Sequence, residues 1–283
     1  MKRVLVAGAT GYLGRYVVTE LKKQNHRIRA LARDKSKLSD LKNHIDEIVE
    51  AEVTRPETLH GICDEIDVVF SSIGITRQKD GLTFMDVDYQ GNKNLLDEAK
   101  KDHVNKFIYV SVLNAHQMKD LKVIQAKELF VTKLKESGLD YVVIRPTGFF
   151  SDMLEFLKMA RKGKISLFGN GQNKINPIHG VDLAEVCVSL LDKSEKEINI
   201  GGPEILTYKE IAELAFSTLN KKPKIATLPV WAIRIILPIM RTFTSSGTYG
   251  PVEFMMSVMT MDVVGDKYGK ERLENFFRQA PLD

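Results

Sequence analysis

Short runs of apolar residues alternate with longer amphipathic segments through the first half of the chain. The first run, Arg3–Ala7, is followed by the segment Tyr12–Gln24, in which Val17, Val18 and Leu21 share one helical face. This alternation is typical of parallel strands joined by crossover helices. The pattern therefore predicts an α/β fold with a doubly wound parallel sheet.

The same two periods continue along the chain. We expect strands at 27–32, 48–51, 67–71, 107–111, 141–144 and 198–200, and helices at 91–101, 125–137 and 181–191. After Pro146, glycine and proline punctuate shorter elements, which indicates a smaller second lobe. We expect a first domain over 1–150, its sheet completed from 175–202, and a smaller, mostly helical lobe over 151–283. Within this lobe, Thr207 is predicted to cap a helix over 209–219.

A glycine-rich turn joins the first strand to the first helix. Glycines at such a turn let the backbone bend sharply and approach a pyrophosphate, whose charge then lies at the helix N-terminus. The strand before the turn and the helix after it are the context that this motif needs. The expected cofactor-binding residues of the turn are Gly8, Thr10, Gly11, Tyr12, Leu13 and Gly14.

The end of the second strand distinguishes between the two nicotinamide dinucleotides. An acidic residue there would bind a ribose 2′-hydroxyl, whereas an arginine accommodates a 2′-phosphate. The strand ends in Ala32-Arg33, and Lys35 and Lys37 follow. The sequence therefore favours NADP(H), with Arg33 and Lys37 near the phosphate. The alternative is a solvated basic loop without a ligand. Since NADP(H) is favoured, we expect residues 1–150 to form an NADP-binding Rossmann domain and residues 151–283 a substrate lobe.

Composition and charge exclude several classes of protein. The chain carries 41 basic and 37 acidic residues, a balance that gives no argument for a nucleic-acid partner. Cys63 and Cys187 lie far apart in apolar contexts, which favours a reducing compartment, and we expect a cytoplasmic protein. The histidines and cysteines lack metal-ligand spacing, so we expect no metal site.

Motifs along nearly the whole chain resemble those of the atypical short-chain dehydrogenases/reductases, a group that includes NmrA-like proteins, divinyl chlorophyllide reductases and the 39 kDa complex I subunit. The matching segments are Gly8–Gly14, Ala32–Asp34, Val87–Asn92, Tyr109–Ser111, Lys127, Ser137–Tyr141, Ile144–Pro146, Ile178–Ala184 and Ile200–Pro203. These motifs are specific for the superfamily and not for one substrate.

The resemblance implies a cofactor laid across the carboxyl ends of the strands. It puts Glu52 and Val53 near the adenine. Ser111 takes the position of the family's active-site Ser or Thr, and Lys127 that of the lysine that holds the nicotinamide ribose. The other residues implied to line the cofactor are Ser71, Ser72 and Ile73 near the ribose linker and Pro146, Thr147 and Phe149 beside the nicotinamide.

One position departs from the family pattern. The catalytic tyrosine should precede Lys127 by four residues, and Val123 stands there instead. Valine cannot take part in acid–base chemistry, so a proton for a reduced substrate must come from another group. The candidates are Lys127, which we favour, Ser111, His116, His179 and water. Several atypical members also lack the tyrosine, some of them reductases and others only cofactor binders, so the substitution leaves open whether the chain is an enzyme.

The last quarter of the chain is rich in Ile, Leu, Phe and Met, above all over 231–243 and 252–264. Apolar helical stripes usually belong to a core. The alternatives are a hydrophobic ligand pocket, for which adaptable methionines are suited, and a peripheral membrane contact through 231–264 in which Arg234 and Arg241 meet anionic headgroups.

Two functions from different classes follow. The first is an NADPH-dependent reductase that delivers hydride to a conjugated double bond or carbonyl of a small apolar substrate. The second is a non-catalytic NADP(H)-binding sensor or assembly and regulatory protein. The missing tyrosine disfavours a sugar-nucleotide epimerase. The substrate and the oligomeric state stay open.

Overall fold

The computed structural model describes residues 1–75, 81–231, 235, 237–238, 242, 244 and 246–280. The chain forms two compact units, each of which combines segments distant in sequence. The first contains residues 1–145 and 183–198, and the second contains residues 146–182 and 199–283.

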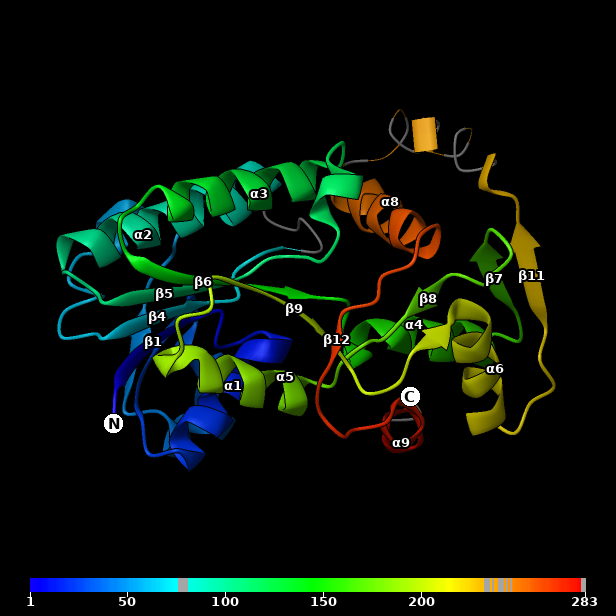
Figure 1. Cartoon of the computed structure of the whole chain (residues 1–283), viewed down its shortest axis with the longest axis horizontal. Helices are drawn as coiled ribbons and strands as arrows, with labels where there is room; N and C mark the ends of the chain where they lie inside the picture. The colour runs from blue at the N-terminus through cyan, green and yellow to red at the C-terminus, as the bar shows by residue number, and fades with distance from the viewer. Residues whose placement is uncertain are drawn as a thin grey trace. The chain divides into compact units, whose positions relative to one another are not determined.

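A parallel sheet of eight strands has the order β12-β9-β6-β5-β4-β1-β2-β3 (Figure 1). Its central strands are buried on both faces, which explains why they are near-continuous runs of Val, Ile and Leu. The strands are β1 (Arg3–Ala7), β2 (Arg27–Ala32), β3 (Glu47–Glu50), β4 (Val68–Ser71), β5 (Lys106–Val110), β6 (Asp140–Pro146), β9 (Glu197–Gly201) and β12 (Asp266–Lys267).

Helices cover both faces of this sheet. Figure 1 shows α1 (Tyr12–Lys23) and α5 (Gly180–Ser189) on one face, and α2 (Asn92–Lys101) and α3 (Lys122–Lys135) on the other. Phe130 of α3 packs against the rings of Phe107 and Tyr109 on the sheet. Shorter segments connect these elements: η1 (Lys35–His44), η2 (Pro56–Thr58), the π-helix η3 (Met85–Gly91), η4 (Ala115–Met118) and η5 (Leu190–Asp192).

The second unit contains helices and two small sheets. Strand β7 (Ile165–Phe168) pairs in parallel with β11 (Ile225–Leu228), and β8 (Lys174–Ile175) pairs with β10 (Leu206–Thr207) in antiparallel. The helices described are α4 (Phe150–Arg161), α6 (Tyr208–Thr218), α8 (Ser246–Met259) and α9 (Leu273–Gln279). Thr207 caps α6 as predicted, because its side chain accepts a hydrogen bond from the Glu210 amide.

The predicted doubly wound parallel sheet is confirmed, and each predicted strand is present within one or two residues of its expected bounds. Two methionines of the apolar C-terminal region, Met256 and Met259, are buried in α8. Trp231 and Ile235 are exposed. Arg234 and Arg241 lie outside the described residues. Among the residues described, no helix is both long and apolar enough to cross a membrane.

Candidate functional site

The glycine turn after β1 is tightly folded against its neighbours. Gly8 has a left-handed backbone with φ of 91°, and a Cβ there would lie 2.7 Å from the Ser72 hydroxyl oxygen. A Cβ on Gly14 would lie 2.1 Å from the carbonyl oxygen of Gly8. The amide of Gly11 donates to that same oxygen at 2.9 Å. Both glycines are therefore required by close approach of the backbone.

The turn leaves the start of α1 ready for an anion. Gly11 caps the helix without a side chain, Thr10 is exposed, and the first turn contains no acidic residue. Leu13 is buried, while the ring of Tyr12 packs edge-on against Tyr16. Free amides and the positive end of the helix dipole favour a phosphate at such a terminus. This geometry fits a dinucleotide pyrophosphate.

Basic residues gather beyond the end of β2. The Arg33 side chain is 57% exposed and lies 3.8 Å from the Glu52 carboxylate. Lys37 is also exposed. The nearest acid in sequence, Asp34, is engaged elsewhere: its carboxylate accepts from the amide and hydroxyl of Ser36, and these bonds lower the pKa of Asp34. Arg33 and Lys37 are thus exposed basic residues beyond this strand.

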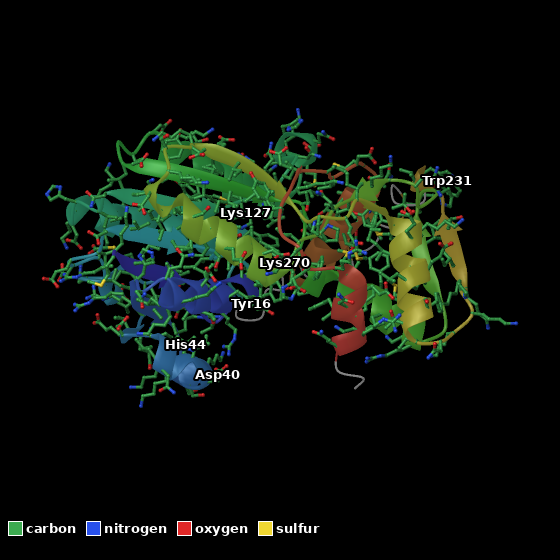
Figure 2. The ribbon with its side chains drawn as sticks, turned by 60° about the horizontal axis from the view of Figure 1, so that its bottom comes forward. Tyr16, Asp40, His44, Lys127, Trp231 and Lys270 are labelled. Carbon is green, nitrogen blue, oxygen red and sulfur yellow. The ribbon has the colours of Figure 1, made fainter. Side chains whose placement is uncertain are left out.

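The structure brings Arg15 to the same region, a residue that the sequence analysis missed. Its guanidinium donates to the carbonyl of Lys37 at 3.1 Å and pairs with Asp40, which Figure 2 labels on η1. The available signal was a basic residue immediately after Gly14, since the first turn of α1 faces the segment after β2.

The end of β4 is tied to α2 by a buried polar network. The Ser71 hydroxyl donates to Asn92 at 2.6 Å, and the Ile73 amide donates back to the Ser71 hydroxyl at 3.3 Å. The Ser72 amide donates to the carbonyl of Ala7, which joins this loop to the glycine turn. After β3, the carbonyl of Val53 accepts from Asn94. The predicted residues at the ends of β1 and β4 therefore lie together.

Beneath the loop after β4, Lys127 forms an ion pair with Asp88. The two atoms, Nζ and Oδ1, are 2.9 Å apart, and the Asp88 side chain is fully buried. Nζ also lies 5.6 Å from the ring centroid of Tyr109. Burial is the largest single effect and would lower the pKa of Lys127, but the charges and hydrogen bonds of Asp88 and Tyr109 together raise that pKa above its usual value. Burial also raises the pKa of Tyr109, to about 12.

Ser111, the second predicted catalytic residue, is held by a separate charged cluster. Its hydroxyl donates to the Glu128 carboxylate at 2.7 Å, and Arg145 holds both oxygens of that carboxylate at 2.7 and 2.8 Å. Ser111 is only 3% exposed. The proton of Ser111 is thus directed at an ionised partner within the protein. Glu128 follows Lys127 on α3, so one turn of this helix carries both clusters.

The other expected residues follow Arg145 along the chain, from the last residue of β6 onward. Thr147 and Phe149 belong to the second unit, as does Pro146. The Thr147 hydroxyl donates to the carbonyl of Asn176 at 2.6 Å, and Phe149 precedes α4.

Of the histidines considered as proton donors, His179 packs between aromatic rings of Phe150 and Phe276, and its Nδ1 accepts from the Val181 amide. Burial lowers the pKa of His179. These contacts give His179 a packing and capping role. His116 is exposed on η4. In the described part of the chain, no group of three or more His, Cys, Asp or Glu side chains could hold a metal ion.

Comparison with known proteins agrees with this geometry. A family model described as NAD(P)H-binding matches residues 8–194. A photosystem II assembly factor of Synechocystis is 28% identical over 86% of this chain and 74% of its own length. A chloroplastic divinyl chlorophyllide a 8-vinyl-reductase of Cucumis sativus is 30% identical over 98% of this chain and 75% of its own length.

Solved structures share the fold at low sequence identity. An NADPH-dependent quinone oxidoreductase from Escherichia coli, complexed with NADPH, superimposes with a TM-score of 0.74, 17% identity and 98% coverage of both chains. A nucleoside-diphosphate-sugar epimerase from Staphylococcus aureus gives a TM-score of 0.76 at 15% identity, over 99% of this chain and 100% of the epimerase. The family model, the two relatives and the shared fold together confirm the resemblance to atypical short-chain dehydrogenases/reductases.

Proposed function

The chain belongs to the NAD(P)H-binding family, and on that premise we propose that it is an NADPH-dependent reductase of a small hydrophobic molecule with a conjugated double bond or a carbonyl group. The observation that carries this proposal is the glycine turn that opens α1 without a side-chain cap or an acid in its first turn. That turn is built to receive a pyrophosphate.

The choice of NADPH rests on the basic residues after β2. Arg33 exposes its guanidinium, Arg15 and Lys37 lie in the same region, and Asp34 is occupied by Ser36. In this proposal Arg33 clamps the 2′-phosphate through charge-assisted hydrogen bonds. Glu52, 3.8 Å away, orients the guanidinium when no nucleotide is bound.

When bound, NADPH supplies hydride, and the protein supplies position and charge. Lys127 would donate hydrogen bonds to the nicotinamide ribose from its place beneath the loop after β4. Ser71 and Asn92 hold that loop in shape. The apolar substrate class is suggested by the relative whose name is that of a vinyl reductase.

A second candidate is a cofactor-binding assembly or regulatory protein. Val123 on α3 occupies the position of the family's proton donor, and one relative is named as an assembly factor. Cofactor binding is common to both candidates, so turnover separates them.

Calorimetric titration with NADPH and NADH tests the proposal. We expect wild type to prefer NADPH, and Arg33→Ala to weaken NADPH binding about tenfold while leaving NADH binding unchanged, since one charge-assisted contact is lost. Lys35→Ala removes a neighbouring exposed charge and serves as the matched control. Failure of both nucleotides to bind would overturn the proposal. Tight NADPH binding without oxidation by quinones, enones or aldehydes would favour the second candidate.

A further inference from the structure

Three elements converge on the Asp88–Lys127 ion pair. Asp88 comes from the π-helix η3, Lys127 from α3, and the loop after β4 crosses above them. The Ile75 amide of that loop donates to Asp88 Oδ2 at 3.2 Å. A Cβ on Gly74 would lie 2.6 Å from Asp88 Oδ1 and 2.7 Å from Lys127 Nζ. The pair is therefore covered closely by backbone.

Both oxygens of the fully buried Asp88 carboxylate have a partner. Oδ1 forms the ion pair with the Lys127 ammonium, and Oδ2 accepts from the Ile75 amide. Burying a charge without such partners is strongly unfavourable, so each member of the pair depends on the other. π-Helical turns are frequent at functional sites, and this one directs Asp88 toward α3. Only the Lys127 side chain keeps some contact with solvent, at 13% exposure.

We infer that Asp88 is a positioning residue: it fixes Lys127 beneath the loop after β4 as an immobile, permanently charged hydrogen-bond donor for the cofactor ribose, so that Lys127 does not supply the proton for reduction. This inference rests on the proposed function for the identity of the ligand. It replaces our expectation that Lys127 also donates the proton, since an ammonium held by a buried carboxylate is a poor acid.

The charge coupling is testable without any cofactor. In protein with ¹³C-labelled lysine, the Lys127 ε-carbon signal is assigned by its loss in Lys127→Met and followed against pH. We expect Lys127 in wild type to titrate above the ordinary lysine value of about 10.4. In Asp88→Asn we expect Lys127 to titrate at a lower pH than in wild type, because the largest effect that opposes burial is removed. An unchanged titration in Asp88→Asn would overturn the coupling. Asp86→Asn, which changes a partly exposed acid of the same π-helix, is the matched control.

A double-mutant cycle separates positioning from a purely structural role. We expect Asp88→Asn and Lys127→Met each to weaken NADPH binding about tenfold. The double variant replaces the pair by neutral groups, so we expect it to recover stability relative to Lys127→Met without recovering NADPH affinity. Recovery of affinity together with stability would show that the pair only supports the fold, and would overturn the inference.

The same titrations distinguish this inference from the proposed function. If wild type binds neither NADPH nor NADH, the proposed function and the role of Lys127 toward the ribose both fail, while the carbon titration still decides whether Asp88 holds the charge of Lys127. If wild type binds NADPH and Asp88→Asn binds it equally well, the proposed function stands and the inference fails.

Discussion

The glycine turn has no space for a side chain at Gly14. A Cβ would lie 2.1 Å from the Gly8 carbonyl oxygen and 2.9 Å from the Cα of Ala9. The φ of Gly14 is not in the left-handed region, so the effect of a substitution is steric. We expect Gly14→Ala to lower the free energy of unfolding by about 2 kcal/mol, as overpacking does, and to weaken nucleotide binding. Urea denaturation and calorimetry measure the two effects.

Gly138 provides the control for this prediction. It has a φ of 83° and no atom within 4 Å of the position of its Cβ, so Gly138→Ala tests backbone strain without crowding. We expect Gly138→Ala to destabilise the fold by about 1 kcal/mol and to leave nucleotide binding intact. Equal effects of the two variants on nucleotide binding would contradict the steric explanation for Gly14.

At the scale of elements, the strands and helices with a regular pattern of apolar residues were predicted from the sequence. The buried strands were located within one or two residues because their apolar runs are continuous. The π-helix η3 was missed because its hydrogen bonds skip one residue more than those of an α-helix, and the pattern indicated a helix only from Gly91. The segment η1 was not predicted, although Leu38 and Leu41 are buried within it.

The candidate site also contains some features that local sequence predicts and others that only the folded chain shows. The glycine turn and Arg33 were predictable because local sequence defines them. The partners of Lys127 and Ser111 were not, since Asp88 reaches Lys127 across 39 positions and Glu128 reaches Ser111 only when α3 packs on the sheet. Motif position singled out Lys127 and Ser111 as candidates, whereas tertiary packing determines the partners of their side chains.

Helix α6 offers a prediction for a single element. The Thr207 hydroxyl accepts from the Glu210 amide, and the Glu210 carboxylate accepts from the amide of Thr207 at 2.7 Å. We expect Thr207→Ala to lower the free energy of unfolding by about 1 kcal/mol, the usual effect of losing an N-cap. Thr207→Ser keeps the hydroxyl and should restore most of this loss in urea denaturation. Equal stabilities of the two variants would mean that the capping box contributes little.

At the scale of the whole molecule, chain order and compact units do not coincide. Residues 183–198 return to the first unit after the chain has entered the second. They are anchored there by Lys106, whose ammonium donates to the carbonyls of Leu190 and Lys193 and pairs with Asp140. Local periods carry no information about such a return, so the organisation into units depends on contacts that only the folded chain displays.

The proposed nucleotide contacts of the glycine turn, Arg33 and Lys127 all lie in the first unit, which leads to a prediction about where binding stabilises the molecule. NADPH at a hundred times its Kd should raise the free energy of unfolding by about 2.7 kcal/mol, because it binds only the folded state. In hydrogen exchange, we expect the strongest protection at amides of 8–14 and 71–75. Arg33→Ala should reduce the protection at the same NADPH concentration, and Lys35→Ala should not. Protection confined to residues 199–280 would place the nucleotide elsewhere and contradict a site built on the glycine turn.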